Sequence, residues 1–257
     1  TYDWHGQVDR AIEACGHAID LTPDHAEAHA YLAEAHVDAG NWAEATEMAN
    51  KALDLDGNSV DVQRNYGYVM EVQGNYTAAI EAYKRALEIH PNLAYLHIAV
   101  GNNYLALGDV GAALESFQRA TEVDPNSARA YYRLGRARYE RGELDQAQEA
   151  LEQAVEVDPQ FGPAFGYLGF TYWSRRNYEE AIPSLERAIR LESAMARRRA
   201  RRFFLTLEPD AGPVASPSSS VVMSGDFAPR SLGDGDTLRA DLEPLTTDAG
   251  WQEARGS

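Results

Sequence analysis

The sequence predicts an all-α fold, a right-handed solenoid of repeated antiparallel helix pairs. Three observations lead to this prediction: a 34-residue period, columns of small residues that recur at that period, and helical spacing of the apolar residues within each unit. Alanine fills two of these columns six times in succession. The columns are Ala11, Ala45, Ala79, Ala113, Ala147 and Ala181, and Ala18, Ala52, Ala86, Ala120, Ala154 and Ala188.

Each unit is expected to hold two helices that are separated by a glycine turn and followed by a proline. Glycine suits the turn because it adopts the left-handed conformation at a helix end without a Cβ penalty. Proline ends one helix and starts the next. Small residues in a further column allow two helices to approach closely, since larger side chains would overpack the contact. The turn column is Gly40, Gly74, Gly108 and Gly142, and the close-approach column is Ala33, Gly67, Gly101, Gly135 and Gly169.

These features resemble the tetratricopeptide repeat family in unit length, in the small-residue and alanine columns, and in the proline column Pro91, Pro125 and Pro159. The resemblance covers about residues 6–195. It implies a non-enzymatic scaffold for protein–protein interaction, and it does not identify the partner.

Four regions follow from the repeat register. Residues 1–25 form an N-terminal half repeat, and residues 26–195 form five tetratricopeptide-like repeats. Residues 196–208 are expected to be a basic capping helix. Residues 209–257 are rich in Pro, Gly, Ser and Asp, yet apolar residues recur through them. We therefore expect this tail to become ordered by docking on its own solenoid or on a neighbouring one.

The two ends of the repeat region are expected to be complementary. Residues 8–21 read as a second helix without a first, and residues 194–207 as a first helix without a second. Residues 1–60 carry 12 acids and 2 bases, whereas residues 194–208 carry 5 arginines and 1 acid. The leading hypothesis is head-to-tail assembly of identical copies into a filament or tube; a basic cap packed on the fifth unit is the simpler interpretation. The expected interface residues are Val8, Ile12, Cys15, Ile19, Arg197, Arg198, Arg201, Arg202, Phe203, Phe204 and Trp251.

The alternative hypothesis is a monomeric adaptor that binds an acidic peptide. In the family the first helices line a concave groove, and Arg129 and Arg133 match positions that hold a peptide carboxylate in chaperone-binding members. Tyr68 and Ala99 stand where that clamp has asparagines, so a chaperone-type clamp is not expected. A solvated face with local pairs such as Arg136 and Glu140 is the competing interpretation. The resemblance implies these groove residues: Arg64, Asn65, Tyr68, Asn102, Arg129, Tyr132, Arg133, Arg136 and Tyr139.

Composition argues against several other functions. The net charge of −17 disfavours a nucleic-acid partner. The single cysteine, Cys15, excludes a disulfide framework, and no apolar run reaches the roughly 18 residues of a membrane span. His25 and His29 lie four residues apart at a helix start, as a metal site could, but His29 and His36 fall in core columns that packing explains, so neither a metal nor a cofactor is expected. No catalytic constellation is recognisable. A filament would favour an extracellular or cell-surface location, and an adaptor a cytoplasmic or periplasmic one.

Overall fold

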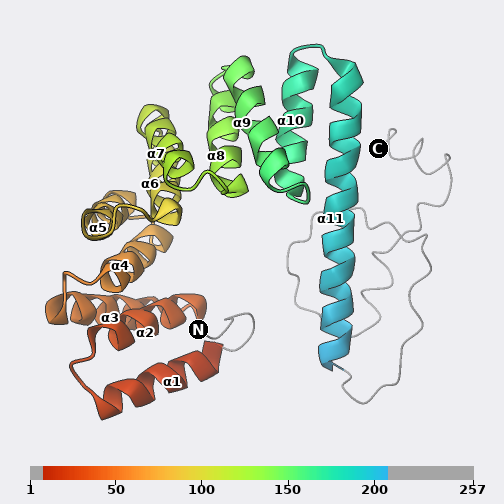
Figure 1. Cartoon of the computed structure of the whole chain (residues 1–257). Coiled ribbons are helices and arrows are strands. Elements are labelled where there is room, and N and C mark those ends of the chain that lie inside the picture. The colour runs from red at the N-terminus through yellow and green to blue at the C-terminus, as the bar shows by residue number, and fades with distance from the viewer. Residues whose placement is uncertain (1–7, 208–257) are drawn as a thin grey trace. The chain divides into compact units, whose positions relative to one another are not determined.

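A computed structural model describes residues 8–207, and their side chains as far as residue 193. The described residues form helices and the turns between them, without a strand (Figure 1). The helices are α1 (Val8–Leu21), α2 (Ala26–Asp38), α3 (Trp42–Leu55), α4 (Val60–Val72), α5 (Tyr76–Ile89), α6 (Ala94–Ala106), α7 (Val110–Val123), α8 (Ala128–Glu140), α9 (Leu144–Val157), α10 (Gly162–Ser174) and α11 (Tyr178–Leu207).

The chain divides into two structural units, residues 1–185 and 186–257. The described part of the first unit contains the helix pairs and the start of α11. In this unit α2 packs on α3, α4 on α5, α6 on α7 and α8 on α9, and the second helix of each pair contacts the first helix of the next (Figure 1). The predicted all-α solenoid of helix pairs is therefore confirmed. The described part of the second unit is the remainder of α11.

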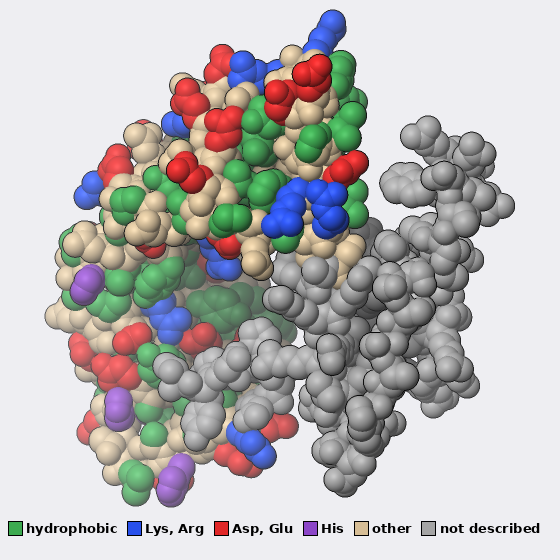
Figure 2. All heavy atoms as spheres, turned by 45° about the vertical axis from the view of Figure 1, so that its right-hand side comes forward, with side chains coloured by type: hydrophobic (Ala, Val, Ile, Leu, Met, Phe, Trp, Pro, Cys, Tyr) green, Lys and Arg blue, Asp and Glu red, His purple; other side chains and the backbone are tan. Residues whose placement is uncertain are grey.

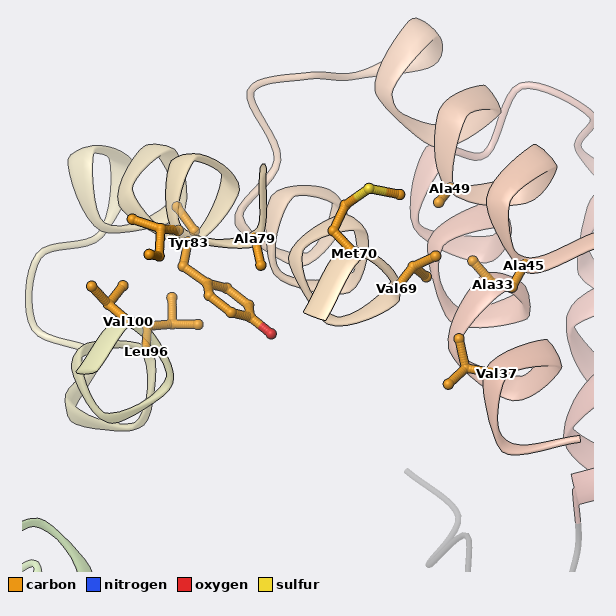
Figure 3. Packing of buried hydrophobic residues seen from close by; sticks show 12 residues of the cluster. Ala33, Val37, Ala45, Ala49, Val69, Met70, Ala79, Tyr83, Leu96 and Val100 are labelled. Atoms are coloured by element: carbon orange, nitrogen blue, oxygen red, sulfur yellow. The ribbon is translucent and has the colours of Figure 1, made fainter. Parts of the chain in front are cut away.

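In four of the helix pairs, a glycine on the first helix packs against a larger residue 16 positions later. A Cβ atom added to Gly67 would lie 2.6 Å from the Tyr83 ring, and one added to Gly101 would lie 2.5 Å from the Phe117 ring. In the first complete pair the partners are Ala33 and Ala49, both buried (Figure 3). A small partner on the second helix thus tolerates a methyl group on the first, as close packing requires.

The turn within each pair has the left-handed conformation that its glycine predicts. Gly40, Gly74, Gly108 and Gly142 have φ between 77° and 80°. In the fifth pair the same position is Arg176, with a φ of 62°. An L-residue other than glycine costs about 1–2 kcal/mol in this conformation, so Arg176 is a strained point of the first unit.

The end of the last helix differs from the prediction. A separate basic helix was expected over residues 194–207, but this segment continues α11 without a break. The physical reason is local: Ser193 stands where earlier units have a proline or glycine, and nothing there interrupts the helix. Residues 208–257, including the expected docking tail, lie outside the described residues.

Candidate functional site

The first helices of successive pairs share one surface. We call this surface of α2, α4, α6, α8 and α10 the first-helix face. Hydrogen bonds cross it between residues 30 positions apart: Tyr31 donates to Asp61 at 3.0 Å, and Tyr68 donates to Asp38 at 3.2 Å. Since one repeat has 34 residues, such bonds join equivalent helices of neighbouring repeats. They align the polar side chains of α2 and α4 along a single surface.

An aromatic cluster forms the C-terminal half of this face, on α8 and α10. Tyr167 is at its centre, with ring centroids 5.7 Å from Tyr132, 5.9 Å from Tyr139 and 6.2 Å from Phe170. Phe161 packs edge-on against Tyr132 at 5.3 Å. Phe170 is 44% exposed, and Figure 2 shows hydrophobic side chains at the surface in the upper part of the view, where α10 lies. The contacts within the cluster are edge-to-face, an arrangement that aromatic pairs favour.

Arginines on α8 accompany these rings. The guanidinium of Arg136 lies 5.5 Å from the Tyr167 centroid, and its Nε donates to Glu140 at 2.8 Å, the local pair that the sequence suggested. Arg133 lies 5.8 Å from the Tyr132 ring. Neither Arg133 nor the exposed Arg129 has an ion-pair partner among the described residues. Of the three predicted α8 arginines, Arg136 is therefore the one with an ion-pair partner among the described residues.

Arg133 is the most unusual of these cations. Its Nε is buried and has no hydrogen-bond partner among the described residues. Burial lowers the pKa of Arg133, and the positive charges of Arg136 and Arg129 lower it further. A desolvated guanidinium beside two like charges favours a nearby anion, because a carboxylate would supply both the missing charge and the missing acceptor.

The N-terminal half of the face differs from the predicted arginine and tyrosine stripe. Arg64 is neutralised by Glu34, at 3.2 Å, and lies 5.7 Å from the Tyr31 ring. Asn65 was expected to line the face, but it is 0% exposed, because the surrounding side chains cover it. Asn102 is half-buried, with an Oδ1 atom that lacks a partner among the described residues. The predicted stripe thus divides into two halves of different character.

Sequence reasoning missed several residues of the face. Tyr167 and Phe170 lie 34 residues after Arg133 and Arg136, and Glu34 lies 34 residues before Tyr68. The repeat register could have found all three, since equivalent positions in a solenoid share a surface. Glu71 lies two repeat lengths before the predicted groove residue Tyr139, so the register could have found it as well, although its partners Tyr83 and Asn103 come from other columns.

The predicted subunit-interface residues fall into two groups. On α1, Val8, Ile12, Cys15 and Ile19 are half-buried. Burial, followed by the charge of Glu34, raises the pKa of the Cys15 thiol, which opposes formation of a reactive thiolate. The predicted interface residues whose side chains fall outside those described are Arg197, Arg198, Arg201, Arg202, Phe203, Phe204 and Trp251.

Two searches of the described residues bear on other functions. No group of three or more His, Cys, Asp or Glu side chains among them could hold a metal ion. The His29 ring lies 2.9 Å from the Pro23 carbonyl oxygen through Nε2, a contact that accounts for its position in the packing. None of the helices described has the length and apolar character needed to cross a bilayer.

Repeated helix pairs with a shared polar and aromatic face define a helical-repeat interaction scaffold. Tetratricopeptide repeat models match residues 5–60 and 32–94, residues 72–127 and 104–168, and residues 164–194. Together these matches span most of the chain. The chain belongs to the tetratricopeptide repeat family.

Solved structures of similar fold include MamA, with 26% identity, a TM-score of 0.58, and coverage of 64% of this chain and 96% of MamA. YrrB, described as a TPR protein with an unusual peptide-binding site, has 28% identity and a TM-score of 0.56, and the match covers 70% of this chain and 93% of YrrB. PilF of Pseudomonas aeruginosa shares the fold at 18% identity, with a TM-score of 0.63 and coverage of 80% and 87%. No curated protein sequence gives a significant match.

Proposed function

We propose that this protein is a non-enzymatic adaptor that binds an acidic peptide segment on the C-terminal half of its first-helix face. The observation that carries the proposal is the pair Arg129 and Arg133, which have no carboxylate partner among the described residues and lie beside an aromatic cluster. Membership of the tetratricopeptide repeat family supports a role in protein–protein interaction, and the similar structure YrrB is described as having a peptide-binding site.

The chemistry of α8 suits a carboxylate. A guanidinium presents a planar fork of donors that matches two carboxylate oxygens. The missing partner of the buried Arg133 Nε could be such an oxygen. Hydrogen bonds to charged groups contribute about 1.5–3 kcal/mol each, so one good arginine–carboxylate pair accounts for roughly a tenfold or larger change in affinity. The rings of Tyr132 and Tyr167 would contact the apolar part of the peptide at little entropic cost.

The test measures binding of a fluorescent library of peptides, each with two to four acidic residues, by anisotropy. The variant Arg129→Gln with Arg133→Gln is expected to weaken the tightest binders at least tenfold. Arg119→Gln is the matched control, because Arg119 is an exposed arginine of a second helix, α7, and pairs with Glu122 at 2.9 Å. The control should change affinity less than twofold. Equal binding by the wild type and the double variant would disprove the proposed site.

A second candidate function is self-assembly, favoured by the surface of α1. Cys15 is half-buried, whereas its repeat equivalents Tyr83, Phe117 and Leu151 are buried. A second copy of the chain would cover this face, and the opposite charges of residues 1–60 and 194–208 would favour a head-to-tail contact. Because residues 194–207 continue α11, the contact would need a different geometry from two halves of one hairpin.

Light scattering over a wide concentration range at low salt tests self-assembly. If the chain assembles, its average mass should rise with concentration, and the variant Ile12→Asp should have a lower mass than the wild type. The control variant Glu13→Asp, at a neighbouring exposed position of α1, should have the same mass as the wild type. A constant monomeric mass would exclude this second function.

A further inference from the structure

The N-terminal half of the first-helix face carries excess negative charge. Glu34, Asp38, Asp61 and Glu71 of α2 and α4 take part in its contacts. Among the residues that the structure describes, Arg64 is the one cation paired with any of these four, at 3.2 Å from Glu34 and 3.8 Å from Asp61. The other two carboxylates, Asp38 and Glu71, have no cationic partner among the described residues. This half therefore has the opposite sign to the arginines of α8.

Neutral donors hold the two unpaired carboxylates in place. Tyr68 donates its hydroxyl to Asp38 at 3.2 Å. Glu71 accepts two hydrogen bonds on the same oxygen, Oε2, from the Tyr83 hydroxyl at 2.8 Å and from the Asn103 amide at 2.9 Å. Tyrosine and asparagine orient these carboxylates without cancelling their charge. The second oxygen of Glu71, Oε1, has no hydrogen-bond partner among the described residues.

Tyr68 is affected by several of these carboxylates, and it contacts Asp38 directly at 3.2 Å. The pKa of Tyr68 is raised to about 12, first by burial, then by Asp38, and further by Glu34 and Glu71. Three negative charges from α2 and α4 thus act on one hydroxyl group. A cationic side chain near Tyr68 would experience their combined attraction.

A buried amide on α4 has no hydrogen-bond partner among the described residues. Asn65 is 0% exposed, and neither its Oδ1 nor its Nδ2 makes a hydrogen bond among the described residues. In the repeat register Asn65 is equivalent to Tyr31 and Arg133, whose side chains contribute to the first-helix face. Because surrounding side chains cover Asn65, it is not available to a bound peptide, and the charged side chains at the surface determine which peptide this half can bind.

We propose that the first-helix face selects a bipolar peptide, with a basic residue at Asp38 and Glu71 and an acidic residue at Arg129 and Arg133. This inference rests on the proposed acidic-peptide site and adds its second specificity element. The site for the basic residue joins Asp38 of α2 and Glu71 of α4, and the site for the acidic residue lies on α8, two repeats after α4. Packed helices are spaced by about 8–10 Å and extended chains rise by about 3.3 Å per residue, so at least roughly five residues separate the two charges of the ligand.

The test compares three fluorescent peptides of equal length with a neutral six-residue spacer. Two carry lysines at one end and aspartates at the other, in the two possible orders, and the third carries aspartates at both ends. One bipolar order is expected to bind at least tenfold more tightly than the all-acidic peptide. Asp38→Asn with Glu71→Gln should remove this advantage, and Asp38→Asn alone, at an exposed position, should reduce it in a chain with an intact core.

The control variant is Glu115→Gln with Glu149→Gln, which removes the same charge from exposed positions of the second helices α7 and α9 and should preserve the advantage. If the all-acidic peptide binds as tightly as both bipolar peptides, or if the advantage survives loss of Asp38 and Glu71, the bipolar inference is wrong. The acidic-peptide site and the bipolar specificity can be disproved independently. Wild-type binding of every peptide by the Arg129→Gln, Arg133→Gln variant would overturn the acidic-peptide site itself.

Discussion

The contact between Gly101 and Phe117 gives a quantitative prediction about the core. In Gly101→Ala, the new methyl would lie 2.5 Å from Cε1 and 2.7 Å from Cδ1 of a ring that is 0% exposed. The ring cannot withdraw without displacing its neighbours, and such overpacking costs about 1–3 kcal/mol. Alanine gains about 1 kcal/mol over glycine in a helix interior. The net expectation is a destabilisation of about 0–2 kcal/mol.

Removal of the ring should reverse the sign of this effect. Phe117→Ala alone is expected to cost about 3–5 kcal/mol. In that background Gly101→Ala should stabilise the protein by about 1 kcal/mol, because the methyl then enters vacated space. The pair Ala33 and Ala49 already shows that two alanines fit at this contact. The resulting coupling energy is about 1–3 kcal/mol.

Urea denaturation followed by circular dichroism measures each step of this cycle. Gly111→Ala on α7 is the control, since the nearest atom to its added Cβ is 3.6 Å away. It should be neutral or stabilising in both backgrounds. Equal shifts of the Gly101→Ala midpoint in the presence and absence of the Phe117 ring would refute the packing argument.

Two further predictions concern conformation and pH. Arg176→Gly should raise the melting temperature by relieving about 1–2 kcal/mol of strain at a φ of 62°; a lower melting temperature would contradict this. Tyr68, with its pKa raised to about 12, should keep a neutral phenol well above the ordinary tyrosine pKa of about 10. Its contribution to stability is therefore complete below about pH 10 and is lost as the pH rises toward 12. The pKa of Tyr68 is measured as the difference between the ultraviolet titrations of the wild type and of Tyr68→Phe. A Tyr68 ionisation near pH 10 would contradict the prediction. Asp38→Asn should lower the midpoint of the Tyr68 ionisation, because it removes a neighbouring negative charge.

The repeat pattern predicted the backbone well because its signals are local. Gly74 and Gly108 are needed at turns within a few residues of the helices that they end, and Ala79 and Ala113 are small because the adjacent helix is close. The prediction was wrong at Ser193, where α11 continues. A missing proline is a weaker signal than a present one, because several residue types can either continue or end a helix.

The candidate site was only partly predictable. The register brought Arg129, Tyr132 and Arg133 to the first-helix face, but it treated Arg64 as equivalent to them. Arg64 is neutralised by Glu34, 30 residues earlier, and Asn65 is covered. Register identifies positions that share a surface, whereas burial and pairing depend on the side chains that occupy neighbouring repeats.

Sequence alone determined the helix pairs, their glycine turns and the family, because each depends on spacing within one 34-residue period. Tertiary structure decided the charge of the first-helix face, since Glu34 meets Arg64, and Glu71 meets Asn103, only when neighbouring repeats stack. The physical reason is that electrostatic interactions depend on distances of a few ångströms in space. Residues about 30 positions apart acquire those distances only in the folded solenoid.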